Sequence, residues 1–133
     1  MMKISQVLYE LFESEANSPD LEGLTAVHEL DREIRLVGEN GQSQYISWIW
    51  DPSLESYVIG LSNESYFVQP PTLVHDVTDS VIWSQLADQS VSFVFVHGDT
   101  PVLEIHGDEK TIYCWAQTNT LCVSGQPRSE KVR

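Results

Sequence analysis

The first apolar positions of the chain have the spacing of an amphipathic helix. Over residues 3–15 they recur at intervals of three and four, so they would share one stripe of a helix. A proline within residues 17–20 ends this stretch, because the residue before a proline avoids the helical conformation. The pattern predicts a helix over residues 3–15 whose stripe faces the core or, alternatively, a partner. The stripe consists of Ile4, Val7, Leu8, Leu11 and Phe12.

Short apolar runs separated by turn residues follow, a pattern typical of strands. Asp31-Arg32 is a candidate tight turn between the first two runs. The segment Gly38–Gly41 contains Asn-Gly, which supplies the positive φ that hairpin turns need. This part of the chain predicts an antiparallel meander. Its strand candidates are Thr25–Leu30, Glu33–Val37, Tyr45–Trp50, Tyr57–Leu61 and Tyr66–Val68.

The second half of the chain repeats this order with a helix and further strands. Asp76 has the chemistry of a helix N-cap, and the residues near 77–88 include Trp83 and Leu86 on an apolar face. The run Phe93–Val96 is apolar without alternation, which predicts a central strand covered on both faces. The strand candidates here are Ser90–His97, Val102–His106, Thr111–Trp115 and Leu121–Val123.

The order helix, meander, helix, meander predicts an α+β fold. We expect a mostly antiparallel sheet of about six or seven short strands, covered on one face by an N-terminal helix and a helix near residues 77–88. The length of 133 residues fits a single domain spanning residues 1–133. Residues 127–133 read as a flexible basic tail.

Negative charge is concentrated in the middle of the chain. The net charge is −13, and residues 36–109 contain eleven acidic residues but no lysine or arginine. Average composition would place about eight bases in such a stretch. Its carboxylates have no internal partners, so they form either a solvated surface or a surface that meets a cationic partner.

Composition excludes several classes of function. No basic patch is present to neutralise phosphates, so direct binding of nucleic acid is not expected. No apolar run reaches the roughly 18 residues that a membrane span needs. The N-terminal segment carries glutamates and does not resemble an export signal, so we expect a cytoplasmic protein.

The residues that could carry chemistry do not form a known catalytic or metal motif. His97-Gly98-Asp99 and His106-Gly107-Asp108 contain metal donors, but a straight strand between the histidines would hold them roughly 25–30 Å apart. We therefore expect no metal, no cofactor and no catalytic residues. Cys114 and Cys122 would lie nearly opposite each other on paired strands, with free buried thiols as the default expectation.

Aromatic and acidic residues gather in the base-free stretch and define the candidate surface. Aromatic side chains ringed by charge are typical anchors of protein interfaces, although the same rings could simply fill the core. Further acids are expected at turns. The candidate partner-binding residues are Trp48, Trp50, Asp51, Glu55, Tyr57, Glu64, Asp99, Asp108 and Glu109.

Four functions fit these observations, the last of them a mimic of duplex DNA that binds DNA-handling proteins, which charge alone does not separate from the first. The first is an inhibitor or immunity protein that neutralises a basic, nuclease-type toxin by occluding its active site. The second is a small acidic chaperone of a secreted effector, which would share the predicted order of helices and strands. The third is a small-ligand-binding protein or an enzyme of unknown reaction. Whether the chain is a monomer or a dimer is left open by the sequence.

Overall fold

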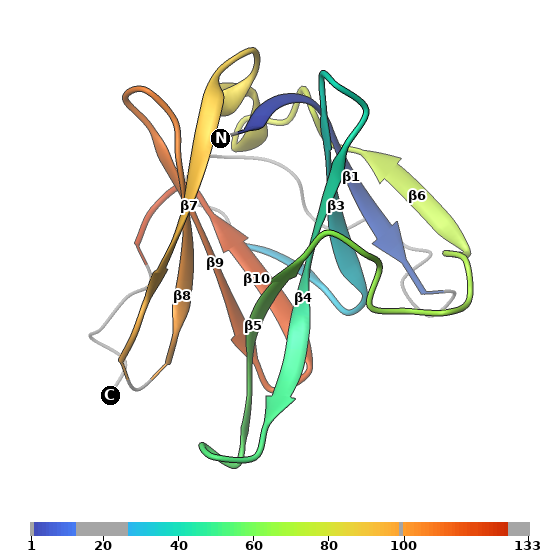
Figure 1. Cartoon of the computed structure of the whole chain (residues 1–133), viewed down its shortest axis with the longest axis vertical. Coiled ribbons are helices and arrows are strands. Elements are labelled where there is room, and N and C mark those ends of the chain that lie inside the picture. Colours follow the sequence, from blue (N-terminus) through green and yellow to red (C-terminus); the bar gives the residue numbers. More distant parts are fainter. Residues whose placement is uncertain (1, 13–26, 99, 128–133) are drawn as a thin grey trace.

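In the described part of the chain, a strand and a short 3-10 turn stand in place of the two predicted helices. The computed structural model describes residues 2–12, 27–98 and 100–127, which form ten antiparallel strands and one short 3-10 helix (Figure 1). The predicted α+β class, with helices over residues 3–15 and near 77–88, is therefore wrong, and the fold is nearly all antiparallel β. The strands are β1 (Met2–Leu11), β2 (His28–Leu30), β3 (Glu33–Gly38), β4 (Ser43–Asp51), β5 (Ser56–Ser62), β6 (Leu73–Asp76), β7 (Ser90–Val96), β8 (Val102–His106), β9 (Thr111–Gln117) and β10 (Thr120–Ser124).

The ten strands form one sheet whose two halves face each other across the core (Figure 1). The first half has the order β2-β10-β9-β8-β7. The second has the order β1-β3-β4-β5, and β6 also pairs with β1. The halves join where Met2 and Lys3 of β1 pair with Val91 and Ser90 of β7. Both halves contribute fully buried side chains to the core, among them Ile34, Leu36, Ile46, Leu103, Ile105 and Ile112.

A β-bulge in β1 explains why this strand has helix-like spacing. The ladder between β1 and β3 skips one residue at Ser5. Ile4 and Val7 are consequently both buried although they are three positions apart. Alternation by two then resumes at Tyr9 and Leu11. One interval of three inside a strand is enough to imitate one face of a helix.

The second predicted helix is reduced to one 3-10 turn, Trp83–Leu86. Asp76 does bind the backbone that follows it, but in a local turn. Its carboxylate accepts hydrogen bonds from the N–H and the hydroxyl of Thr78, at 3.0 and 2.5 Å, and these bonds lower the pKa of Asp76. Serine, threonine, aspartate and β-branched residues dominate this segment, and they favour such local turns over a helix. The apolar side chains expected on the helix face are still buried: Ile82, Trp83 and Leu86.

The two turns predicted on either side of β3 have different outcomes. Gly38–Gly41 does join β3 to β4, with Gly41 at a φ of 84°, so that prediction is confirmed. Asp31-Arg32 joins β2 to β3 but makes no hairpin. β2 pairs with β10, whereas β3 pairs with β1 and β4. The chain therefore crosses from one half of the sheet to the other at Asp31-Arg32.

β7 is not the doubly covered central strand that its apolar run predicts. It pairs with β8 along Ser92–Val96, but on its other side it pairs with β1 only at Ser90 and Val91. Its second half is exposed, with 40–42% of Val94, Phe95 and Val96 open to solvent. A continuous apolar run fits both a covered strand and an uncovered edge, and periodicity does not separate the two.

Both cysteines are free and buried, as the sequence predicts, but they are not opposite each other. Cys122 pairs with Trp115, and Cys114 pairs with Val123. This offset of one residue places the two thiols on opposite faces of the sheet, where they cannot form a disulfide. Burial raises the pKa of the Cys114 thiol, which keeps it protonated.

A buried chain of polar side chains links the two halves of the sheet. Trp83 donates its indole N–H to the Tyr9 hydroxyl at 2.7 Å, and the same hydroxyl lies 2.7 Å from Nδ1 of His28. All three side chains are essentially inaccessible to water. Burial raises the pKa of Tyr9, so its hydroxyl stays neutral. This one hydroxyl ties β1, β2 and the 3-10 turn together.

Tyr9→Phe should therefore destabilise the fold without changing its shape. The substitution leaves buried polar atoms of Trp83 and His28 without their partner, at a cost of about 1–3 kcal/mol in the free energy of unfolding. Denaturant titration would measure this loss. The matched control is Tyr113→Phe, at a half-buried residue of β9. This substitution should change the free energy of unfolding by less than about 0.5 kcal/mol. Equal effects of the two substitutions would contradict the role given to the Tyr9 hydroxyl.

Candidate functional site

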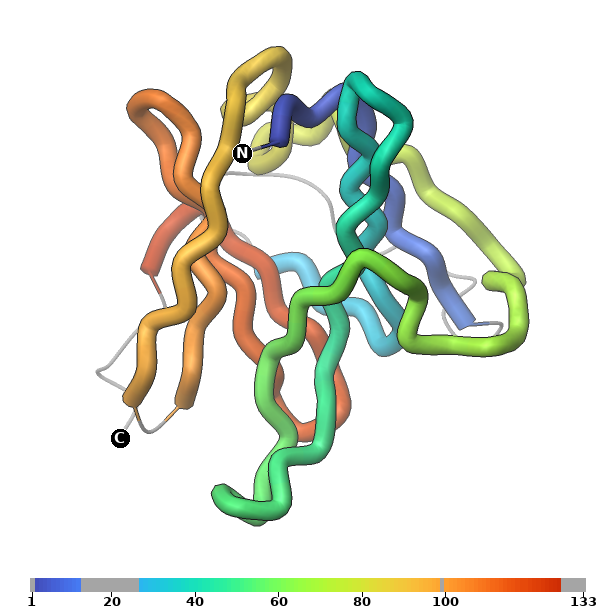
Figure 2. The backbone as a smooth tube through the Cα atoms, in the orientation of Figure 1, coloured from blue at the N-terminus to red at the C-terminus, as the bar shows by residue number. Residues whose placement is uncertain are grey.

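The β4–β5 hairpin brings together five of the residues predicted to bind a partner. Trp50 is directly opposite Tyr57 in the ladder, and their rings meet edge to face at 5.1 Å. Trp48 meets the other side of Tyr57 at 5.3 Å. Asp51 and Glu55 flank the turn at the tip, which projects from one end of the molecule (Figure 2). The hairpin thus presents aromatic rings and carboxylates side by side.

The two tryptophans differ in what they can offer a partner. Trp48 is half-buried, packs on the core and donates its indole N–H to the backbone oxygen of Asp31 at 2.8 Å. Trp50 is 53% exposed. Trp48 therefore positions the hairpin, whereas Trp50 is available for contact.

The tip of the hairpin is held in a defined shape by its own side chains. The Asp51 carboxylate accepts hydrogen bonds from the hydroxyl and the backbone N–H of Ser53, at 2.6 and 2.9 Å. These bonds lower the pKa of Asp51, which keeps it ionised. Glu55 has a left-handed backbone with a φ of 48°. Between them Leu54 is 54% exposed, so an apolar side chain stands between two acids.

A cavity of about 270 Å³ lies beside the tip. It is bounded on one side by the hairpin and on the other by the turns that follow β7 and β9, and none of the described residues that line it is charged. An uncharged cavity that combines hydroxyl and amide groups with apolar side chains suits the insertion of a partner's side chain. The lining residues are Leu54, Ser56, Tyr57, Val58, Thr100, Pro101, Ala116, Gln117 and Thr118.

A buried arginine supports the aromatic residues from beneath. Arg32 is 2% exposed, and its guanidinium lies 4.8 Å from the ring centroid of Phe67. Phe67 in turn meets Trp48 edge to face at 6.3 Å. Contacts thus run from Arg32 through Phe67, Trp48 and Tyr57 to the exposed Trp50. Sequence patterns did not reveal this support, because it joins four separate segments.

Arg32 is held in place by hydrogen bonds and ion pairs. Its guanidinium lies 3.2 Å from a carboxylate oxygen of Glu33 and 3.5 Å from one of Glu10, and it donates to the backbone oxygen of Gln69 at 2.7 Å. Arg35 approaches Glu10 from the other side at 3.8 Å. Two arginines thus neutralise two buried carboxylates.

Glu33 fixes the segment between β5 and β6. Its carboxylate accepts hydrogen bonds from the Ser65 hydroxyl at 2.6 Å and from the Tyr66 backbone N–H at 3.1 Å. Burial and this carboxylate raise the pKa of Tyr66 to about 12. A Cβ on Gly60 would lie 2.8 Å from the Tyr66 hydroxyl, so glycine at this position leaves room for the Tyr66 side chain as it is placed here. The strand predicted at Tyr66–Val68 is thus an irregular segment anchored by a buried acid.

The remaining predicted partner-binding residues are not part of this cluster. Glu64 is exposed beyond the other end of β5. Asp108 and Glu109 lie in the turn between β8 and β9, at the end of the molecule opposite the hairpin tip (Figure 2). Asp99 lies outside the described residues. The acids therefore occupy both ends of the molecule, and only one end combines them with exposed aromatic residues.

Two exposed apolar residues at this surface were not among the predicted residues. Ile49 and Leu54 are 38% and 54% exposed, and Ile49 is on the face of β4 opposite Trp50, whereas Leu54 is at the tip. The position of Leu54 inside a turn rich in proline, serine and acids was the available signal, because turn residues lie at the surface. Ile49 gave no such signal, since it reads as an ordinary strand residue.

No metal-binding cluster is formed within residues 2–12, 27–98 and 100–127. His106 instead lies 2.7 Å from Glu104 on its own strand. Across the same described ranges, no helix has the length and hydrophobicity that a membrane crossing requires. Comparisons with known protein families, curated proteins and solved structures found no match.

The buried carboxylates predict a pH dependence of stability. Burial, a hydrogen bond with Glu33 and repulsion by Glu33 raise the pKa of Glu10, and the two arginines only partly oppose this. The folded state therefore binds more protons than the unfolded state once the pH exceeds 4.5, and the contribution of Glu10 to stability falls as the pH rises further. The free energy of unfolding of wild type minus that of Glu10→Gln should decrease between about pH 4 and about pH 7.

Denaturant titrations across that pH range would measure the difference. Glu29→Gln is the control, because Glu29 is the exposed residue of β2. The substitution removes one charge at a site away from the buried pair. A difference between wild type and Glu10→Gln that rises with pH would contradict the assigned shift.

Proposed function

We propose that this protein is an acidic protein-binding module of the cytoplasm that inhibits a basic, nuclease-type toxin by covering its active site. The observation that carries the proposal is the hairpin tip. There the exposed Trp50 and Leu54 lie next to the carboxylates of Asp51 and Glu55, in a stretch of chain with no lysine or arginine.

Charge supports a cationic partner. Residues 36–109 contain no base to neutralise their acids, so the hairpin surface attracts positive charge. Such attraction speeds encounter and orients the partner, and it weakens as salt screens it. Carboxylates at the tip can occupy the sites where a nuclease binds the phosphates of its substrate.

Shape supports an anchored contact. Trp50 is supported by Tyr57 and Trp48, so little side-chain freedom is lost when it is buried by a partner. Tryptophan and tyrosine dominate the binding energy of interfaces when they are surrounded by residues that exclude water. Leu54 at the tip is one exposed apolar residue that can contribute to such a surround.

The alternative function as an effector chaperone has lost its support. It rested on the predicted order of helices and strands, and the described residues contain a strand and a 3-10 turn where those helices were expected. A ligand-binding role has no charged group to favour it among the described residues that line the cavity beside the tip.

Variants of the tip test the proposal. Wild-type protein carrying an affinity tag should retain one basic protein from a lysate of the native host, and mass spectrometry would identify it. Trp50→Ala should weaken binding of that protein by about 30-fold, mainly through faster dissociation. Asp51→Asn with Glu55→Gln should slow association and flatten its dependence on salt.

The control is the acidic turn at the other end of the molecule. Asp108→Asn with Glu109→Gln removes the same charge and should change affinity much less than the tip variants. The captured protein should cleave nucleic acid, and wild-type protein should block that cleavage in a stoichiometric titration. An inactive or acidic captured protein would refute the proposed function, as would equal effects of the two double variants.

A further inference from the structure

β7 exposes five residues of unpaired strand edge. Its ladder with β8 covers Ser92–Val96, whereas its pairing with β1 stops at Val91. Among the described residues, no strand continues the sheet beside Ser92–Val96. Every second residue of this stretch therefore directs its N–H and C=O to the open side, where they lack a strand partner.

This edge lacks the features with which proteins normally protect an exposed strand. Lysine, inward-pointing charges, proline and bulges usually prevent edge-to-edge pairing. The run from Ser90 to Gly98 has no Lys, Arg, Asp, Glu or Pro, and its ladder with β8 is regular. Val94, Phe95 and Val96 are each at least 40% exposed in a chain whose net charge is −13. The edge is thus uncharged, free of bulges in its ladder with β8 and exposed over Val94–Val96.

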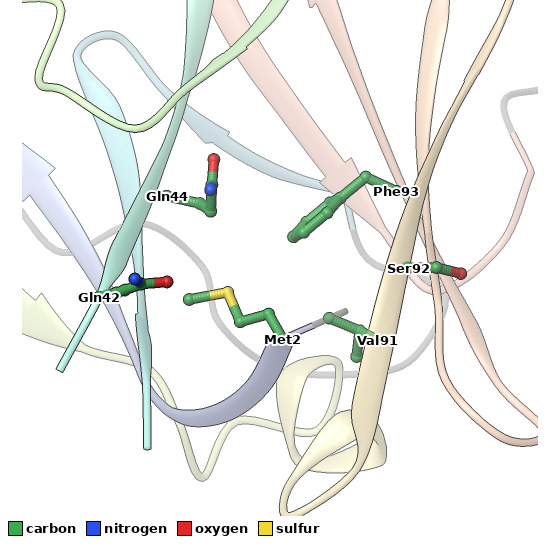
Figure 3. A pocket seen from close by; sticks show the side chains of 6 residues that line it. All are labelled: Met2, Gln42, Gln44, Val91, Ser92 and Phe93. Carbon is green, nitrogen blue, oxygen red and sulfur yellow. The ribbon is translucent and has the colours of Figure 1, made fainter. Parts of the chain in front are cut away.

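A cavity of about 360 Å³ opens beside the same edge. Figure 3 shows Phe93 pointing across the opening toward Gln44 of β4, with Met2 between the two halves of the sheet and Ser92 pointing away. The lining is apolar or uncharged, and Val91 and Gln42 complete it. A strand added beside β7 would direct the side chain opposite Phe93 into this space.

We propose that a second copy of this chain pairs with it through β7, in an antiparallel ladder centred on Val94. The two-fold axis makes Val94 its own partner and pairs Ser92 with Val96 of the second copy. It also places Phe95 of the second copy opposite Phe93, beside the cavity. The ladder uses all five open residues. It stops at Val91, because Met2 already occupies the position beside that residue.

Charge favours a second copy over a basic segment at this edge. Two chains of net charge −13 repel each other over most of their surfaces, so they associate only where charge is absent. The five open residues of β7 carry no charge, and the acid opposite Val94 in the ladder, Glu104 of β8, lies 2.7 Å from His106. The described residues that line the cavity include no carboxylate to bind a lysine or arginine. A five-residue seam is short, so the dimer is weak and added salt strengthens it by screening the repulsion. This is the opposite salt dependence to that proposed for the hairpin tip, and the two proposals stand independently.

Sedimentation equilibrium tests the dimer directly. From about 5 µM to about 500 µM chain, the average mass should rise from that of one copy toward that of two, and more steeply at high salt. Val94→Lys should raise the dissociation constant of the dimer at least about 10-fold, because it places the lysine of one copy directly opposite the lysine of the other at the two-fold axis. Val74→Lys is the control, because it makes the same change at a residue 45% exposed on β6 and should leave the dimer intact.

Cross-linking provides a second readout that does not depend on the lysine variant. Val94→Cys should form a disulfide between copies under mild oxidation, because the two residues face each other at the axis. Val74→Cys should not, and the native thiols are buried. A single-copy mass at every concentration would overturn the proposal. Weakening by salt, equal effects of Val94→Lys and Val74→Lys, or a monomer that binds an extended peptide at β7 would also overturn it.

Discussion

The burial of Arg32 is the constraint on which the rest of the structure depends. Its guanidinium lies between the carboxylates of Glu10 and Glu33 and stacks on Phe67 at the corner where the chain crosses from one half of the sheet to the other. A buried charge is tolerated only when it is fully paired, and removing one partner typically costs about 3–5 kcal/mol. The same residues fix the segment after β5 and support Trp48. A single ionic cluster thus determines both the path of the chain and the position of the hairpin.

From that corner the contacts run outward to the surface. Trp48 packs on Tyr57, and Tyr57 packs on Trp50 and orients its ring. The turn at Asp51 gives the tip beside Trp50 its shape. The result is a rigid aromatic anchor at the end of a hairpin in a region without positive charge. The other end of the molecule carries acids in the turn after β8 but no comparable anchor. The acidity of the chain is therefore general, whereas the aromatic anchor is local, and it is their overlap that defines the candidate site.

Local sequence predicted much of the strand content but not the fold class. The runs at Val102–His106 and Thr111–Trp115 are separated by the turn residues Gly107 and Asp108, so they were predicted nearly at their observed bounds. The failure at β1 came from one inserted residue at Ser5, which is a property of the ladder with β3 and is invisible in a single segment. The aromatic and acidic residues of the hairpin were predicted because they are neighbours in sequence. The Arg32 cluster was not, because it joins residues up to 59 positions apart, from Glu10 to Gln69. The open edge of β7 was missed because an apolar run does not say what covers it.

The central claim is that the hairpin tip is the surface that binds a cationic partner. Hydrogen–deuterium exchange of the protein, alone and with the captured basic protein, tests it most directly. Slower exchange confined to the tip and the neighbouring turns around residues 49–57 and 117–118 is the predicted result. Slower exchange at residues 107–110, with no change at the tip, would contradict it.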